Sequence, residues 1–252
     1  MNRFDHHASS FRSSSQSSRN IFSILLDSSP LSKDVQLHLS KVYGLLTVLM
    51  GISALGCYFS MFVYQLNVTM CALLTVVFAL LLYLSPAHPE VPLLEQRYRL
   101  GLLLTLGFFE GASLAPIVYY ALSIDPNIIF LALLATTVVF VSFSAAALYS
   151  ERREFLYLGG VISSLTLVLF INSLFYTRFS FDVSLYGGLI MFVLYVLYDT
   201  QMIVEKVSIV GSKNADAIHH ALELFIDFVQ LFVRILILLS EKEKKKNNNR
   251  NN

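Results

Sequence analysis

The chain has 252 residues and a net charge of +1, from 18 Lys and Arg residues against 17 Asp and Glu, and 56% of its residues are hydrophobic. Its mean hydropathy is +0.65, whereas about 45–50% of the residues of an average soluble domain are apolar. These values exclude an ordinary soluble domain, and the balanced charge gives no basis for binding nucleic acid.

Residues 1–34 are rich in Ser and contain no apolar run typical of a secretory signal peptide, so we expect a disordered cytosolic N-terminal tail. Apolar blocks of about 17–25 residues follow, each long enough for a helix to cross about 30 Å of hydrocarbon. The sequence therefore predicts an all-α membrane protein with a single helical membrane domain at residues 35–240. Six transmembrane helices are predicted, at residues 42–64, 68–84, 100–122, 127–149, 155–176 and 185–203.

Positively charged side chains alternate between the loops in a way that predicts the orientation of the spans. Lys33 and Lys41 precede the first span, whereas the next loop, at residues 65–67, has neither Lys nor Arg. Because Lys and Arg are enriched on the cytosolic side of membranes, we expect a cytosolic N-terminus. The other loops expected on that side carry Arg97 and Arg99, Arg152 and Arg153, and Lys206 and Lys213.

The third predicted span contains both a packing motif and a carboxylate. Gly107, Gly111 and Ala115 recur every four residues, a spacing that lets another helix approach closely. Glu110 lies in the same span, and a carboxylate at membrane depth is costly unless it has a partner. We expect Glu110 either to form a structural hydrogen bond to a polar group on another span or to line an ion pathway.

The stretch at residues 221–240 is a seventh, weaker candidate span, because Glu223, Asp227, Gln230 and Arg234 interrupt its apolar residues. Their spacing places them in one stripe along a helix. The cost of burying three charges roughly offsets the gain from the apolar side chains. We therefore expect a central helix sheltered by the other six spans, which either crosses the membrane or returns as a re-entrant segment. An amphipathic helix on the cytosolic membrane surface is the alternative.

The end of the chain, residues 241–252, consists almost entirely of Lys, Glu and Asn with one Arg. This composition predicts a basic, disordered tail. Because its positive charges favour the cytosolic side, we expect the C-terminus in the cytosol.

Asp199 lies near the cytosolic end of the sixth predicted span, and a carboxylate there marks a functional site unless a neighbouring Arg or a Tyr hydroxyl pairs with it. A cytosolic loop joins this span to the next segment, so Asp199 and Asp227 are expected to be neighbours. Two carboxylates in one apolar site cannot both ionise cheaply and titrate as a unit. Such a pair can hold a proton, bind a cation or exchange one for the other, which favours a pH-sensitive gate. His219 and His220 lie in the same loop, where we expect a solvated pair.

Motifs for enzymatic chemistry are missing from the sequence. It contains no HExxH, no CxxC and no phosphate-binding Gly loop, and its predicted spans hold no Ser-His-Asp arrangement. We therefore expect no enzymatic activity and no cofactor.

Several stretches, in order, resemble the Bax inhibitor family, also called the transmembrane Bax-inhibitor-motif proteins. They are VQLHLSKVYGLL, RLGLLLTLGFFEGASLAP, FVSFSAAALYSERREFLYLGG, LYDTQMIVEK and LELFIDFVQLFVRILILL. The resemblance is to the Bax inhibitor-1 type and is strongest to its plant members. It implies six helices around a polar seventh, residence in the endoplasmic reticulum membrane, suppression of cell death and a slow, pH-dependent calcium leak.

The resemblance also implies roles for individual residues. Asp199 and Asp227 match the two aspartates taken in the family as the proton-sensing pair of the pore, with calcium bound only transiently nearby. In bacterial relatives an Arg engages that pair, which makes Arg97 and Arg99 the candidate latch in this sequence. Glu223, Arg234 and Glu110 are expected to support the site as further polar residues.

The leading hypothesis is therefore a non-enzymatic regulator in the endoplasmic reticulum membrane that suppresses cell death through a calcium leak gated by the aspartate pair. Its expected partners are the lipid bilayer, calcium ions and other membrane proteins. One alternative is a non-conducting scaffold that modulates partner membrane proteins. Another is an intramembrane aspartyl protease, which Tyr198 and Asp199 would suit, although the sequence lacks the GxGD and PAL motifs of that class.

Overall fold

The computed structural model describes residues 32–87, 91–149, 157–174 and 178–250. Residues 1–31, for which we expect a disordered tail, lie outside the described residues. The described residues form seven α-helices and one short 3-10 helix and contain no strand, which confirms the predicted all-α fold. The helices are α2 (Lys33–Phe62), α3 (Val68–Leu84), α4 (Arg97–Ile124), α5 (Asn127–Tyr149), α6 (Leu158–Leu174), α7 (Arg178–Val210) and α8 (Ala217–Arg250), with the 3-10 helix η1 (Leu93–Glu95) before α4.

The helices α2 to α7 correspond one to one with the six predicted spans. Within the described residues, α2, α4, α5 and the part of α7 from Asp182 to Val210 are long and apolar enough to cross a membrane, and α3 and α6 are shorter apolar helices. Several helices are longer than expected: α2 begins nine residues before the predicted residue 42, and α7 extends seven residues beyond the predicted residue 203. The extra turns carry polar side chains, which hydropathy alone does not assign to a span.

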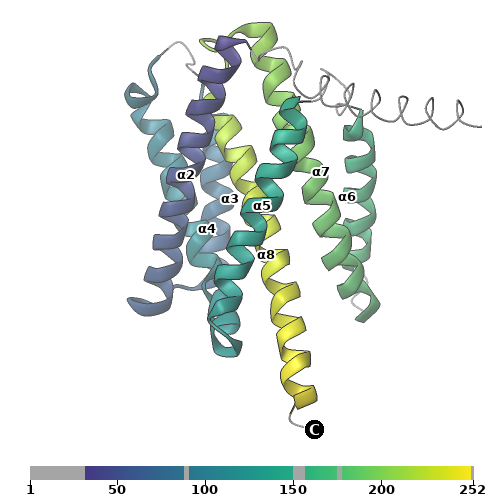
Figure 1. Cartoon of the computed structure of the whole chain (residues 1–252). Coiled ribbons are helices and arrows are strands. Elements are labelled where there is room, and N and C mark those ends of the chain that lie inside the picture. The colour runs from purple at the N-terminus through teal and green to yellow at the C-terminus, as the bar shows by residue number, and fades with distance from the viewer. Residues whose placement is uncertain (1–31, 88–90, 150–156, 175–177, 251–252) are drawn as a thin grey trace, which may run out of the picture. The chain divides into compact units, whose positions relative to one another are not determined.

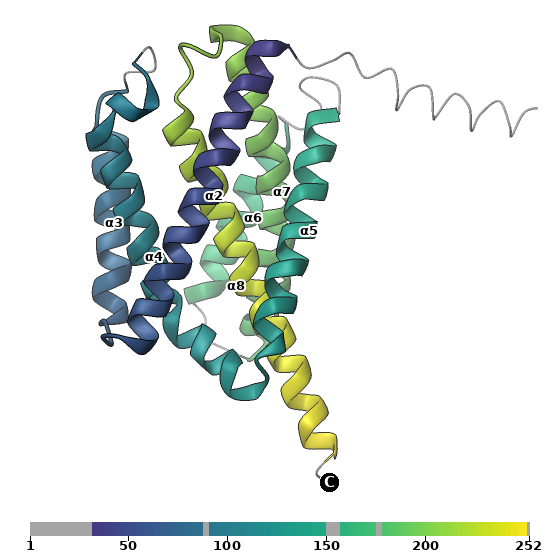
Figure 2. The same cartoon turned by 60° about the vertical axis from the view of Figure 1, so that its left-hand side comes forward.

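The helix α8 lies at the centre of the bundle and packs against α2, α4, α5 and α7, whereas α3 packs on α4 and α6 packs on α7 (Figures 1 and 2). Leu222, Leu224, Phe225 and Leu231 of α8 are buried, and at 100° per residue they extend over about half of the helix circumference. A helix that is apolar on most of its circumference is stable only when protein surrounds it. The predicted central position of the polar-striped helix is therefore observed, but only four of the six other helices pack extensively against it, because α3 and α6 pack on the outside of α4 and α7.

The structure corrects two expectations for the end of the chain. The helix α8 is continuous from Ala217 to Arg250, so it does not turn back as a re-entrant segment, and residues 241–250 are helical rather than disordered. At 1.5 Å per residue, a helix of 34 residues is about 51 Å long, enough to cross a bilayer. The surface-lying alternative is also wrong, because neighbouring helices enclose α8 and thereby reduce the cost of its polar stripe.

The two ends of α8 contact opposite ends of the bundle. His220, near its start, bonds to His38 near the start of α2 at 2.9 Å. Lys244, near its end, donates to the Tyr120 hydroxyl, at the far end of α4, at 3.3 Å. Residues 33 and 250 therefore lie at opposite ends of the bundle (Figure 1), so a crossing α8 would place them on opposite sides of the membrane, and the side on which each lies stays a prediction.

The positions of the two ends can be tested by labelling Lys33→Cys and Asn249→Cys separately, both with Cys57 and Cys71 replaced by Ser. Both positions are exposed. In sealed, uniformly oriented vesicles, a membrane-impermeant maleimide added outside is expected to react with only one of the two cysteines, and permeabilisation should expose the other. Reaction of both cysteines from the same side would contradict the crossing of α8.

The predicted packing motif of α4 lies against α2. A Cβ added to Gly111 would overlap the backbone of Ser53, and one added to Gly56 would overlap the backbone of Phe108. A Cβ on Gly107 would lie 3.0 Å from a methyl group of Leu49. Glycine is therefore required on both helices, because only its missing side chain lets the two backbones approach this closely.

Replacing Gly111 with Ala is expected to lower the free energy of unfolding by roughly 1–3 kcal/mol, because α2 and α4 must move apart. Thermal unfolding in detergent would measure the loss. Gly51→Ala on α2 is the matched control, because a Cβ there has nothing within 4 Å, and better helix propensity should leave it neutral or slightly more stable. Equal behaviour of the two variants would show that the close crossing contributes nothing to stability.

Candidate functional site

The structure brings Asp199 of α7 and Asp227 of α8 together in the interior of the bundle. Their carboxyl groups lie within hydrogen-bonding reach of each other. Asp227 is only 3% exposed, and its Oδ2 atom has no hydrogen-bond partner among the described residues. Two adjacent carboxyl groups of this kind are stable when they share a proton or a cation, because two negative charges in one apolar site repel each other.

Hydroxyl groups from three helices meet at Thr200, the residue that follows Asp199. Thr200 follows Asp199 on α7 and is fully buried, and its Oγ1 is 3.4 Å from the Ser144 Oγ of α5. The Tyr43 hydroxyl of α2 lies near the same two groups. A cluster of three hydroxyl groups thus joins α2, α5 and α7, in a protein whose helices are otherwise mainly apolar.

Glu223 is the one predicted supporting residue that lies near the pair, one turn before Asp227 on α8. Its charge and those of Lys206 and His219 are close enough to act on Asp199. Glu223 also pairs with His219, with 3.3 Å between Oε1 and Nε2. This hydrogen bond raises the pKa of His219, so that its imidazole is protonated more readily than a solvated one.

Arg234 and Glu110 have other partners. Arg234 lies about two turns beyond Asp227, donates to the backbone and side-chain oxygens of Gln230 at 3.1 and 2.8 Å and covers the Phe192 ring at 4.4 Å. Glu110 lies beside the Thr75 hydroxyl of α3. The described contacts of these two residues do not include the acidic pair.

Neither candidate latch residue contacts the acidic pair. Arg97 is exposed, whereas Arg99 is 6% exposed and forms a bidentate ion pair with Asp216, at 3.1 Å from Nη1 to Oδ1 and 2.6 Å from Nη2 to Oδ2. Its Nε donates to the Ser85 hydroxyl at 3.1 Å. Among the described contacts, neither Arg97 nor Arg99 binds the aspartate pair, contrary to the latch hypothesis.

Asp216 joins the ion pair to the start of α8. Its Oδ1 accepts hydrogen bonds from the backbone N–H groups of Ile218 and His219 at 3.1 and 3.3 Å, which caps the first turn of the helix. Burial alone would raise the pKa of Asp216, but hydrogen bonds and charge from Arg99 hold it below its usual range. Arg99 of α4 thereby fixes where α8 enters the bundle.

A buried His pair also ties α8 to α2. The His38 Nε2 lies 2.9 Å from the His220 Nδ1, and the two residues are 0% and 3% exposed. Burial lowers the pKa of His220 to about 4, so the ring is neutral at pH 7. The expectation of a solvated pair is therefore wrong for His220. The burial of His38 could have been predicted from the sequence, because His38 shares one helix face with the apolar residues Val35, Leu39 and Val42.

The described residues contain no cluster of three or more His, Cys, Asp and Glu side chains arranged to hold a metal ion.

Together, the fold and the site define a class: a multi-pass helical membrane protein whose enclosed central helix carries one half of a buried carboxyl pair. A family model described as "Inhibitor of apoptosis-promoting Bax1" matches residues 35–244. The chain therefore belongs to the Bax inhibitor family, which confirms the resemblance found in the sequence.

Curated relatives from plants and animals cover most of the chain. It is 38% identical to Bax inhibitor 1 of Arabidopsis thaliana over 216 residues, which is 83% of each chain. It is 38% identical to Bax inhibitor 1 of Oryza sativa subsp. japonica over 215 residues, 83% of this chain and 82% of the relative. It is 35% identical to Bax inhibitor 1 of Rattus norvegicus over 223 residues, 87% of this chain and 92% of the relative.

Proposed function

We propose that the protein is a non-enzymatic regulator in the endoplasmic reticulum membrane that suppresses cell death through a calcium leak controlled by the Asp199–Asp227 pair. The observation that carries the proposal is the juxtaposition of these two carboxyl groups, one from α7 and one from the central helix α8. The names of the relatives support the part of the proposal that concerns cell death.

The local charges support a cation site at the pair. With Glu223 nearby, three carboxyl groups gather at the α7–α8 contact, and the positive charges that act on Asp199 come from Lys206 and His219, nearer the ends of the helices. Arg99, the buried Arg at this end of the bundle, is occupied by Asp216. A proton or a calcium ion can therefore compete for the same oxygen atoms, and each proton bound reduces the attraction for the cation.

The position of the pair along the helices supports access from the cytosol. The end of the bundle that carries Lys41, Lys206 and Lys213 is the end we assign to the cytosol, because positive residues favour that side. Asp227 comes ten residues after Ala217, where α8 begins at this end, a rise of about 15 Å. The pair would then sense cytosolic pH across about half of the bilayer's hydrocarbon thickness.

The proposal is tested with the purified full-length chain in sealed vesicles loaded with calcium, with an indicator outside. Calcium is expected to leave these vesicles faster than protein-free vesicles of the same lipids, at a rate that changes between pH 5.5 and 8. Identical rates with and without protein would overturn the proposed leak. Protection of death-challenged cells by a variant that does not leak would favour the scaffold function instead.

A further inference from the structure

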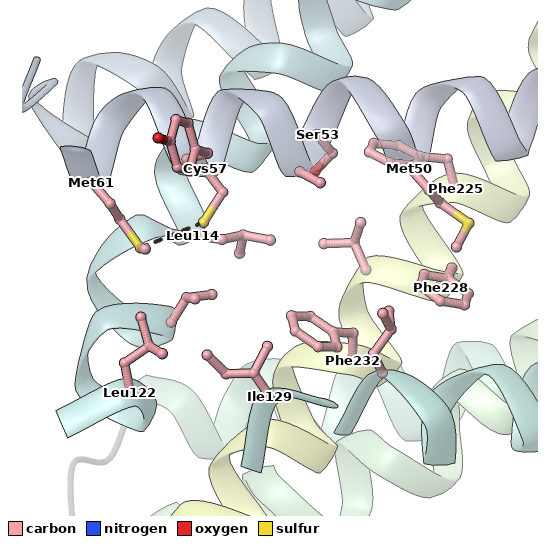
Figure 3. A pocket seen from close by; sticks show the side chains of 15 residues that line it. Met50, Ser53, Cys57, Met61, Leu114, Leu122, Ile129, Phe225, Phe228 and Phe232 are labelled. Carbon is pink, nitrogen blue, oxygen red and sulfur yellow. Dashed lines mark hydrogen bonds between the residues drawn. The ribbon is translucent and has the colours of Figure 1, made fainter. Parts of the chain in front are cut away.

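An apolar cavity of about 320 Å³ lies between α2, α4, α5 and α8, away from the acidic pair. Side chains from all four helices point into it (Figure 3). They include Cys57 and Met61 of α2, Leu114 of α4, Ile129 of α5, and Phe228 and Phe232 of α8. The volume lies at the lower end of the range of pockets that hold small ligands, about 300–1,000 Å³.

The cavity opens sideways because α2 and α5 have no extended packing interface with each other. Both helices pack on α8 and α4, whose side chains also line the cavity. At the edges of the cavity, Tyr58 of α2 is 59% exposed and Leu133 of α5 is 44% exposed. Both α2 and α5 are long and apolar enough to span the membrane, so the opening between them faces the hydrocarbon of the bilayer.

The lining selects against polar and charged ligands. It contains no Lys, Arg, His, Asp or Glu side chain, and its polar groups are those of Ser53, Cys57 and Tyr58. The Cys57 thiol already donates to the Met61 Sδ at 3.9 Å. A free fatty acid would find no positive partner for its carboxylate here, whereas a bare alkyl chain needs none. Flexible Met and aromatic side chains adapt well to such a chain.

We propose that this cavity binds one acyl chain of a membrane phospholipid, which enters between α2 and α5 while its headgroup stays at the membrane surface. An empty apolar cavity loses the dispersion contacts that its lining would make with an occupant. Phospholipid chains are the most abundant apolar groups at the opening. The chain would lie against Phe228 and Phe232 of the central helix, and this binding does not depend on the proposed calcium leak.

The test uses vesicles of dioleoylphosphatidylcholine that contain a phosphatidylcholine with a photoreactive diazirine on one acyl chain. After irradiation, mass spectrometry of the full-length protein is expected to find adducts concentrated on Cys57, Met61, Phe228 and Phe232. The variant Ala54→Trp places a large side chain at an exposed position in the cavity lining. It should reduce these adducts several-fold.

The matched control is Ala72→Trp, at an exposed position of α3 outside the cavity lining. It should leave the cavity adducts unchanged, and equal thermal unfolding of both variants would show that each is folded. Adducts spread evenly over the exposed faces of α3 and α5, with no effect of Ala54→Trp, would overturn the proposal. Cavity labelling by a diazirine-bearing fatty acid or cholesterol, but not by the phosphatidylcholine probe, would overturn it as well.

Discussion

Calcium release from vesicles is expected to lose its pH dependence when either Asp199 or Asp227 is replaced by Asn. The two carboxyl groups lie within hydrogen-bonding reach and titrate as one unit, because ionisation of one disfavours ionisation of the other. Asn has nearly the shape of a protonated Asp but cannot lose a proton. In either single variant the remaining aspartate has, among the described residues, only Glu223 as an acidic neighbour, so the coupled titration of the pair is gone.

The double variant, in which both residues are Asn, is expected to leak less as well as to lose its pH response. Removing both carboxyl groups leaves Glu223 as the acidic group that acts on this position. Negative charge in a narrow, low-dielectric site raises the local concentration of cations at least tenfold. The release rate of the double variant should therefore fall by roughly tenfold or more below that of the unaltered protein.

The control for both experiments is Glu110→Gln, which also exchanges a carboxyl group for an amide inside the bundle. Glu110 lies beside Thr75 of α3 rather than at the pair, so its pH profile should match that of the unaltered protein. Measurement of the release rate from pH 5.5 to 8 distinguishes these outcomes. A pH profile that survives in both single Asn variants would remove the pair from the gating mechanism and leave calcium release to another part of the protein.

The fold and the acidic pair could be predicted from the sequence because both depend on local pattern. The length of each apolar block gives the spans, and the stripe of polar residues at 221–240 identifies a helix that needs shelter. A short loop between two helices makes them neighbours, so Asp199 and Asp227 could be paired without a structure.

The other interactions of the site join residues that are far apart in the sequence. Arg99 and Asp216 are separated by 117 positions, and His38 and His220 by 182. No periodicity relates such positions. The net charge of each loop indicates a side of the membrane but not which Arg meets which Asp. Charge is also a poor guide to the structure of the tail. Its Lys residues favour a disordered cytosolic segment, whereas residues 241–250 continue the helix α8.

Loss of the Arg99–Asp216 ion pair is expected to be the most destabilising single change at this end of the protein. In Arg99→Met, Asp216 keeps its place at the start of α8 but loses its charged partner. Removing one member of a buried ion pair costs about 3–5 kcal/mol, because the other charge remains buried and uncompensated. Asp216 is partly accessible, with 21% of its side chain exposed, so the loss should lie near the lower end of that range.

Two comparisons separate the ion pair from simple loss of a side chain. Arg97→Met removes an exposed Arg from the first turn of the same helix and should change stability by less than about 0.5 kcal/mol. The double variant Arg99→Met with Asp216→Asn should recover part of the loss, because an uncharged Asn can still cap α8 and leaves no unpaired charge. Unfolding by heat or denaturant in detergent measures all of these values.

The pH dependence of the loss identifies its electrostatic origin. Arg99 holds the pKa of Asp216 below the ordinary value of 3.8, so this carboxyl group stabilises the fold at pH above 3.8 and loses that contribution as the pH falls through its lowered pKa. In Arg99→Met, burial is opposed mainly by the hydrogen bond and charge of His219, so the pKa of Asp216 should rise and protonation relieves the unpaired charge. The difference in stability between the two proteins should therefore be full at pH 7 and shrink below about pH 4. A difference that is independent of pH would show that Arg99 stabilises the protein through packing alone.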